Sequence, residues 1–385
     1  MGKERGITMN YQIKAAVLVA CLLAIGVAST PQNASAQDCL QQSALARPIP
    51  LGVSGGNINS FLKFKKGKGC FSGTLGSMVQ DGDGVEYILS NNHVLADINK
   101  AKPGQLIVQP GKIDVAPACL KTASDAVATF TRDVKIAFHG HPNTIDAAIA
   151  AVDPEAVSPD ILNIGPIASS TVAAEVGMPV QKMGRTTCLT TGVVEALDVN
   201  FQINYNETGG KQLANFVNQI IVTGTPSQNG GNSEFSAAGD SGSLIVTDVD
   251  GCPQAVALLF AGPADGGYTI ANPISDVLSG LDVTMVGSCT ESGVVGGTPA
   301  DVASQSVGVT AAVVKSAGSI RDKNEKKLMN IPGALGTGIA AGDEPGQAAI
   351  EVYLVKLTPQ AQAAAPTELE GLPVRLVQTG EVFAY

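Results

Sequence analysis

The sequence has little positive charge, few histidines and no long apolar run. It contains 24 Lys and Arg residues against 34 Asp and Glu, which gives a formal net charge of −10. A chain this acidic lacks the basic grooves that neutralise phosphates, so nucleic-acid binding is not expected. The apolar run near the start, Ala15–Ala28, has 14 residues. Because that is short for a membrane span, no stable span is expected.

The beginning of the chain predicts a cleaved signal peptide over residues 1–36. A net-positive segment, MGKERGITMNYQIK, precedes the apolar run, and Ala34–Ala36 provides a small-residue cleavage site. Leu18–Cys21 also resembles a lipoprotein processing box, but the apolar run continues past Cys21. We therefore expect an exported protein, either periplasmic or secreted.

An even number of cysteines, six, remains after this cleavage. In an exported chain, an even number of cysteines predicts disulfides. The sequence does not choose among the possible pairings. None of the cysteines forms a CxxC or histidine-linked pattern, so a zinc site is not expected. The six residues are Cys39, Cys70, Cys119, Cys188, Cys252 and Cys289.

The part of the chain from Leu51 to Leu281 alternates short β-rich runs with Gly, Pro, Asn and Asp. Examples are GTLGSMV, VEYILS, FVNQIIV, GSLIVTDV and AVALLFA. Runs this short and this frequent predict a mainly β fold, a sandwich or barrels. Because there is no regular βαβ alternation, a doubly wound parallel sheet is disfavoured.

The character of the sequence changes after Cys289. TESGVVGGTPA is typical of a linker, and Thr298-Pro299 is a good helix start. Two predicted strands follow, AIEVYLVKL and LPVRLVQTG. We therefore predict a main domain over residues 37–290 and a small α+β domain over 291–385. The C-terminal unit has no convincing catalytic set, so a regulatory or partner-binding role is expected for it.

The stretch AAGDSGSLIV raises the question of whether Ser241 is a nucleophile or only part of a turn before a buried strand. A serine hydroxyl needs a general base, usually histidine, and the base needs an orienting acid. The chain offers His93, His139 and His141. His93 follows the predicted strand VEYILS, whereas the other two lie in the polar loop FHGHPN and are expected at the surface, not as a metal pair.

The best candidate for the orienting acid is Asp146. It interrupts the apolar run NTIDAAIAAV, where an ionised carboxylate is costly unless it is hydrogen-bonded. Burial beside an imidazole would satisfy it, and the alternative is an edge-strand aspartate that faces water. Weaker candidates, in more polar surroundings, are Asp125, Asp133 and Asp153.

The order His93, Asp146, Ser241 within a β-rich stretch resembles the chymotrypsin- and trypsin-like serine proteases. Further motifs are similar, in order, to bacterial trypsin-like peptidases related to the plant narrow-leaf protein, over about Arg47 to Leu281. These motifs are RPIPLGVSGGN, GTLGSMV, ILSNNHVLA, DAAIA, KMGRTTCLTTGVV and GDSGSLIV. The tail is similar to the small C-terminal unit often fused to such domains. The resemblance implies two six-stranded β-barrels with the triad in the cleft between them.

The resemblance also implies roles for individual residues. Ser241 would attack the scissile carbonyl, His93 would carry the proton, and Asp146 would orient the imidazole. The amides of Gly239 and Ser241 would form the oxyanion hole. Cys188 departs from the family pattern and suggests a disulfide. The substrate pocket would involve Glu234, Phe235 and Gly262; because trypsin carries an aspartate at the pocket base, a preference for Lys or Arg is not expected.

The resulting hypothesis is an exported serine endopeptidase that acts on a peptide or protein through an acyl-enzyme, without a cofactor. No activation site that would create a new N-terminus is evident, so the enzyme is expected to be competent without that step. One alternative is a catalytically silent, protease-like binding protein. Another is an enzyme that hydrolyses esters with the same residues.

Overall fold

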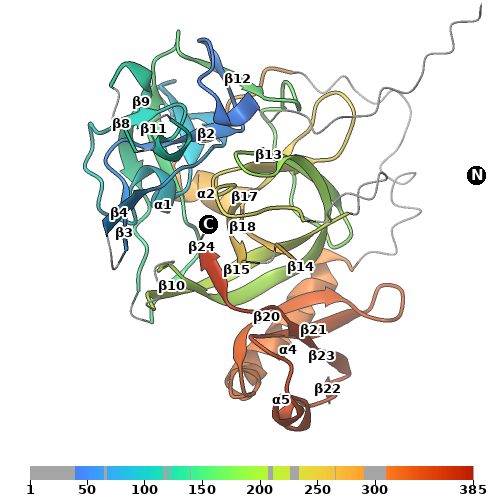
Figure 1. Cartoon of the computed structure of the whole chain (residues 1–385). Coiled ribbons are helices and arrows are strands. Elements are labelled where there is room, and N and C mark those ends of the chain that lie inside the picture. The colour runs from blue at the N-terminus through green and yellow to red at the C-terminus, as the bar shows by residue number, and fades with distance from the viewer. Residues whose placement is uncertain are drawn as a thin grey trace, which may run out of the picture. The chain divides into compact units, whose positions relative to one another are not determined.

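The computed structural model describes residues 40–64, 67–115, 119–120, 123–138, 140–206, 211–225, 234–264, 266–289 and 309–384. The predicted signal peptide, the linker and the predicted helix start at Thr298 lie outside these residues. Within the described part the fold is mainly β, as predicted, and its strands form two curled sheets (Figure 1).

The first sheet is a barrel of six strands. β5 and β6 are separated only by Gly76, and the Gly76 amide donates to Leu89 of β7, so the two act as one long strand. β5 pairs with β2 and β6 with β7, which closes the ring β6-β7-β11-β9-β8-β2-β5. The strands are β2 (Val53–Asn57), β5 (Gly73–Leu75), β6 (Ser77–Gln80), β7 (Glu86–Ser90), β8 (Leu106–Val108), β9 (Ala126–Asp133) and β11 (Ala148–Val152), with β19 (Thr284–Met285) on the outside of β6.

Shorter elements accompany the first barrel. The parallel pair β1–β12 and the antiparallel pair β3–β4 stand beside it. Helix α1 follows β7 almost directly and positions a candidate residue of the site. The bounds are β1 (Ile49–Leu51), β3 (Phe61–Phe64), β4 (Gly67–Cys70), β12 (Val157–Ile161), α1 (Asn92–Leu95) and three 3-10 turns, Leu40–Gln42, Lys112–Asp114 and Ala123–Asp125.

The second sheet also contains a closed ring of six strands. Its order is β15-β18-β17-β16-β13-β14, and β14 pairs with β15 to close it. The double six-stranded barrel implied by the resemblance is therefore confirmed. The strands are β13 (Pro179–Gly184), β14 (Cys188–Asn204), β15 (Leu213–Gly224), β16 (Leu244–Thr247), β17 (Ala255–Pro263) and β18 (Thr269–Pro273), with β10 (Pro142–Asn143) beside β15 and helix α2 (Ile274–Leu281) after β18.

The C-terminal elements continue the second sheet. β14 has 17 residues and pairs along part of its length with β20, so the C-terminal strands extend the barrel's own sheet. Helix α4 packs on β20 and β21, and its buried Arg321 reaches Asp198 of β14 at 2.7 Å. The elements are α4 (Ala311–Met329), β20 (Ala334–Ala341), β21 (Ala348–Leu354), α5 (Pro359–Ala364), β22 (Glu368–Leu369), β23 (Leu372–Gln378) and β24 (Val382–Ala384). The expected boundary near residue 290 falls outside the described residues, so the two-domain division stays a prediction.

One hydrophobic cluster joins the two barrels. Leu244 and Leu258 of the second barrel pack in the same cluster as Leu75 and Val94 of the first. Burial of such apolar surface is the main source of folding free energy. The shared core therefore holds the facing ends of the barrels in a fixed relation.

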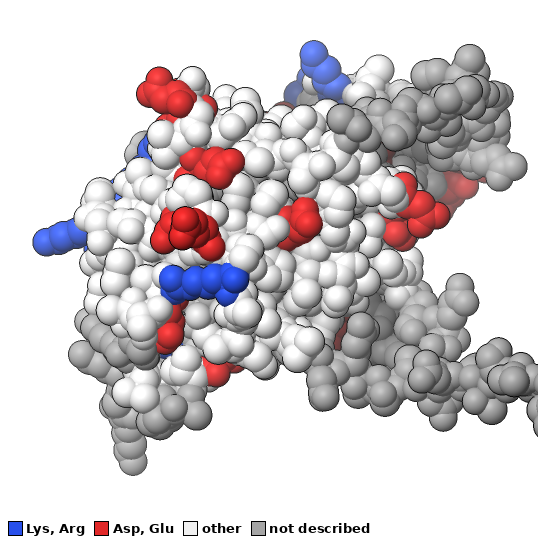
Figure 2. Space-filling model, turned by 90° about the horizontal axis from the view of Figure 1, so that it is seen from above, with Lys and Arg blue, Asp and Glu red and all other residues white. Residues whose placement is uncertain are grey.

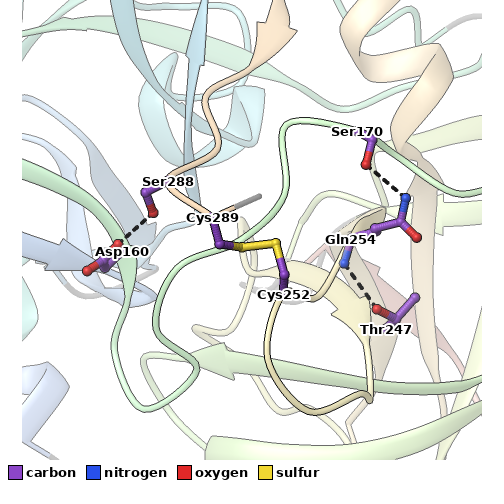
Figure 3. Close-up of a disulfide and its surroundings, with 7 residues drawn as sticks. All are labelled: Asp160, Ser170, Thr247, Cys252, Gln254, Ser288 and Cys289. Atoms are coloured by element: carbon purple, nitrogen blue, oxygen red, sulfur yellow. Dashed lines mark hydrogen bonds between the residues drawn. A yellow bond between two sulfur atoms is a disulfide. The ribbon is translucent and has the colours of Figure 1, made fainter. Parts of the chain in front are cut away.

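Disulfides tie further segments to this core. Cys70 is bonded to Cys119, and Cys252, in the turn after β16, is bonded to Cys289 (Figure 3). Cys188 is disulfide-bonded as well, as the sequence suggested. Beside the second bridge, the hydroxyl of Ser288 donates to Asp160 of β12 at 2.8 Å, so the chain after β19 is fixed to β12 as well as to the turn.

On the face seen in Figure 2, charged side chains stand apart on a mostly uncharged surface. Among the described residues, no helix is both long and apolar enough to cross a membrane.

Candidate active site

His93 is held by a short helix whose flanking asparagines are buried. β7 ends at Ser90, Asn91 adopts an extended conformation as the N-cap residue, and His93 is the second residue of α1. The Asn91 side chain donates to the carbonyl of Asp146 at 2.7 Å, and the Asn92 side chain donates to Asp133 at 2.6 Å. The first bond attaches α1 to the chain that leads into β11, and the second attaches it to the end of β9, so both strands help to set the position of His93.

His93 and Asp146 form a short, buried pair. Nδ1 of His93 lies 2.6 Å from Oδ2 of Asp146, and the His93 backbone amide donates to Oδ1 at 3.3 Å. The two residues are 5% and 0% exposed. Asp146 is therefore not an edge-strand residue that faces water. A carboxylate without solvent needs such donors, because an unpaired buried charge is costly.

Tyr205 is a third partner in this cluster, and no motif in the sequence indicated it. Its hydroxyl donates to Oδ2 of Asp146 at 2.7 Å, and its ring meets the His93 ring edge-on at 6.0 Å between centroids. Burial raises the pKa of Tyr205 well above its usual value, and the neighbouring Asp146 charge adds to this. The phenol is therefore a neutral hydrogen-bond donor at ordinary pH.

Ser241 lies in the turn between Ala237 and β16 and is fully buried. Its hydroxyl donates to the carbonyl of Phe260 in β17 at 3.1 Å, and its own carbonyl accepts from the Thr74 amide at 2.8 Å. The turn thus packs on β5 of the first barrel.

The next residue, Gly242, fixes how closely the two barrels approach here. It has φ +93°, and a Cβ on it would lie 2.1 Å from Oγ of Ser90 and 2.3 Å from the carbonyl oxygen of Thr74. Only glycine fits this contact. The nucleophile candidate is therefore packed against the end of β7, two residues before α1.

Asp240 anchors the same turn from within the second barrel. Its carboxylate accepts from the Thr186 amide and the Thr187 hydroxyl, each at 2.7 Å, and from the Ala237 amide at 2.9 Å. The ammonium group of Lys182 lies 3.7 Å away, and both side chains are fully buried. Burial lowers the pKa of Lys182, and the charge of Asp240 partly opposes this. The cation near Asp240 is therefore Lys182, in the middle of β13, and the sequence did not indicate this partner.

Gly239 adopts φ +101°, and its carbonyl accepts from the Thr74 hydroxyl at 3.0 Å. A Cβ there would lie 2.5 Å from side-chain atoms of Arg185 and Thr186, so this position also requires glycine. Within the described part of the chain, neither the Gly239 amide nor the Ser241 amide donates a hydrogen bond.

The three predicted pocket residues have different surroundings. Phe235 is fully buried in a hydrophobic cluster of the second barrel, and its carbonyl accepts from the Thr190 hydroxyl at 2.7 Å. Glu234 is half-buried beside Gly266. Gly262 lies in β17, where it pairs with Phe383 of β24.

The remaining histidines are not part of the site that the structure describes. His141 is exposed, as predicted, and His139 lies outside the described residues. In the described ranges, no group of three or more His, Cys, Asp or Glu side chains is arranged to hold a metal ion.

A small cavity of about 30 Å³ adjoins His93. A much larger cavity, of about 560 Å³, lies elsewhere, beside β14, β15 and α4. The small one is bounded mainly by aromatic and aliphatic side chains and by the C-terminal strand. Its lining residues are Phe61, Phe71, His93, Asp97, Ile98, Tyr205 and Ala384.

A family model described as the Nal1 C-terminal domain matches residues 65–284, a range that includes His93, Asp146 and Ser241. A comparison with curated proteins found no match.

Solved structures of serine proteases are similar at low identity. A glutamic acid specific serine protease is 20% identical, with a TM-score of 0.41, and the match covers 62% of this chain and 100% of that one. Protease A of Thermobifida fusca is 16% identical, with a TM-score of 0.36 and the same coverage. The chymotrypsin of Cellulomonas bogoriensis is 18% identical, with a TM-score of 0.37, again over 62% and 100% of the two chains.

Proposed function

The chain belongs to the family of the Nal1 C-terminal domain, and on that premise we propose that it is an exported serine endopeptidase. The observation that carries the proposal is the buried bond of 2.6 Å between His93 and Asp146, with Ser241 on the opposing barrel. Export rests on the leader sequence in residues 1–36 and agrees with the disulfides.

In the proposed reaction Ser241 attacks the carbonyl carbon of a peptide bond and His93 accepts its proton. The ionised Asp146 keeps the Nδ1 proton of His93 in place, so Nε2 is the nitrogen that can act as the base. The Ser241 hydroxyl donates to Phe260 at rest, so its proton must turn away from that carbonyl before it is transferred. His93 then donates this proton to the leaving amine as the C–N bond breaks, which leaves the acyl-enzyme. Water attacks the acyl-enzyme and gives a proton to His93, and His93 returns the proton to Ser241 as the acid product leaves.

The developing negative charge on the carbonyl oxygen needs donors that are already in place. The amides of Gly239 and Ser241 are suited to this because neither is used within the described residues. Asp240 supports them indirectly, since its four partners fix the turn between the two amides. Removing one such donor typically lowers kcat by about 10²–10³.

Labelling with a fluorescent fluorophosphonate, read by intact mass, tests the proposal. The wild-type chain should gain one adduct, and Ser241→Ala should gain none. Ser243→Ala is a close control and should keep the adduct, because Ser243 belongs to the same turn and has no role in the proposed reaction. An adduct that persists in Ser241→Ala would refute the assignment.

A second candidate function is a protease-like binding protein without catalysis. The burial of both His93 and Ser241 favours it, because a substrate cannot reach them without a rearrangement. A folded wild-type chain that gives no adduct under any condition would support this function.

A further inference from the structure

The C-terminal strand β24 lies beside the candidate active site. Its residues pair antiparallel with β17, Val382 with Pro263, Phe383 with Gly262 and Ala384 with Ala261. Phe383 also pairs with Asn204 at the end of β14. In Figure 1 β24 is the red arrow next to β17 and β18, separate from the other C-terminal strands.

The direction of β24 points it at Ser241. As the strand runs from Val382 to Ala384, its partners run from Pro263 to Ala261, and the next residue of β17 is Phe260. The Phe260 carbonyl is the group that accepts the Ser241 hydroxyl proton at 3.1 Å. The chain after Val382 therefore approaches the nucleophile candidate along β17.

The side chains of β24 fill space at the same site. Val382 and Ala384 are 2% and 4% exposed and pack in one cluster with Phe260 and Tyr205. Ala384 also lines the small cavity beside His93. A strand held by backbone pairing and by alternate buried side chains is how many proteins bind an extended peptide.

We propose that β24 occupies the position of an extended peptide substrate and acts as an internal competitor for the site. This inference rests on the proposed function, because it names the site's ligand as a peptide strand on Ala261–Pro263. At the position of Ala384 such a peptide must carry a small side chain, since the rings of Phe61, Phe71 and Tyr205 bound the cavity there. Release of β24 is then the step that opens the site.

The first test measures peptide binding without catalysis. The probe is a peptide with the sequence of residues 380–385, GEVFAY, labelled at its N-terminus and followed by fluorescence anisotropy. It is added to Ser241→Ala chains, one of full length and one that lacks residues 381–385. A tethered segment acts at a high effective concentration, so we expect the full-length chain to bind the peptide at least about tenfold more weakly.

Two control peptides sharpen this test. The reversed sequence YAFVEG should not bind, and GEVFWY, with Trp at the Ala384 position, should bind the truncated chain more weakly than GEVFAY. Equal binding of GEVFAY to the two chains would overturn the inference, and so would no binding to a truncated chain that melts cooperatively. Because Ser241→Ala cannot react, these results do not depend on whether the wild type is an enzyme.

A second test covers the case in which the truncated chain does not fold. A recognition sequence for a specific protease is inserted between Gly380 and the exposed Glu381, and the folded chain is cut there. The rate of fluorophosphonate labelling should rise about tenfold or more once the short strand is free to leave. The same insertion and cut between Asp250 and Gly251, an exposed turn, should leave the rate unchanged.

The outcomes separate the two proposals. An unchanged labelling rate after the cut at Gly380 would overturn the inference while leaving the enzyme assignment intact. A chain that is never labelled would instead count against the proposed function. In that case the inference is decided on the cut Ser241→Ala chain, which should bind GEVFAY if β24 is a competitor and should not if it is only part of the fold.

Discussion

Nδ1 of His93 lies 2.6 Å from Oδ2 of Asp146, and both side chains are buried. The two residues come from the same barrel, since β7 and β11 are neighbouring strands with Ser90 opposite Ala148. The pairing of β7 with β11 therefore brings the two residues to the same end of the barrel. Ser241 is different, because it reaches the site only through contact between the barrels.

Asp146→Asn should abolish most activity while the fold persists. An amide in place of the carboxylate favours the wrong imidazole tautomer, and a loss of about 10⁴ in kcat is expected from the behaviour of such triads. Steady-state hydrolysis of a peptide ester measures it. Asp153→Asn is the control and should keep its activity, because Asp153 is exposed and its carboxylate accepts from the Glu155 amide. A loss below about tenfold would assign the orienting role to another acid.

Tyr205→Phe tests the partner that the sequence did not indicate. The variant removes a hydrogen bond to a charged group, typically worth about 1.5–3 kcal/mol, without creating a large cavity. We expect a lower free energy of unfolding in urea and a modest fall in kcat with little change in KM. An unchanged free energy of unfolding would mean that the hydroxyl contributes nothing to the buried carboxylate.

The pH dependence of stability should also report on Tyr205. Its folded pKa lies above the unfolded value of 10.0, chiefly because of burial. Its stabilising contribution is therefore complete below about pH 10 and is lost as the pH rises through the folded pKa. Between about pH 9 and pH 11 the free energy of unfolding of Tyr205→Phe should fall less steeply than that of the wild type. Burial also raises the pKa of Tyr353 well above 10.0, so Tyr353→Phe should show the same effect. Parallel curves for the wild type, Tyr205→Phe and Tyr353→Phe would contradict the prediction.

Lys182→Met should destabilise the protein strongly. It leaves the carboxylate of Asp240 buried without its cation, and breaking such a pair from one side typically costs about 3–5 kcal/mol. Chemical unfolding measures this, and the labelling rate of Ser241 should fall as well, because the turn loses its anchor. The double variant Lys182→Met with Asp240→Asn should regain part of the stability. If the single variant is as stable as the wild type, the backbone donors to Asp240 suffice.

Loss of the Cys252–Cys289 disulfide should lower stability through the unfolded state. The two residues are 37 positions apart, and closing a loop of that length corresponds to about 4 kcal/mol in the chain-entropy description. Replacing both cysteines with alanine should lower the denaturation midpoint without a change in labelling, because the bridge is not part of the site. Removing Cys70–Cys119 is the matched comparison, with a slightly larger loop of 49. Equal midpoints with and without the bridge would contradict the entropic account.

The sequence by itself determined the local features. Short apolar runs between turn residues predicted the strands, and the GDSGS turn and the polar Asp146 within an apolar run indicated the site residues. These patterns can be recognised in the sequence because they involve residues that are close together along the chain. The even number of cysteines in a chain with a predicted signal peptide also predicted disulfides.

Only the tertiary structure decided which distant groups complete the site. Tyr205 meets Asp146 across 59 residues, Lys182 meets Asp240 across 58, and β24 meets β17 across more than a hundred. The tertiary structure also places Phe235 in a hydrophobic cluster and pairs β20 with the long strand β14. These contacts depend on how two closed barrels and a returning chain pack in space, and no periodicity or short motif records that. A buried carboxylate needs hydrogen-bond donors or a cation, and the packing of the fold places the Tyr205 hydroxyl beside Asp146 and the Lys182 ammonium group near Asp240.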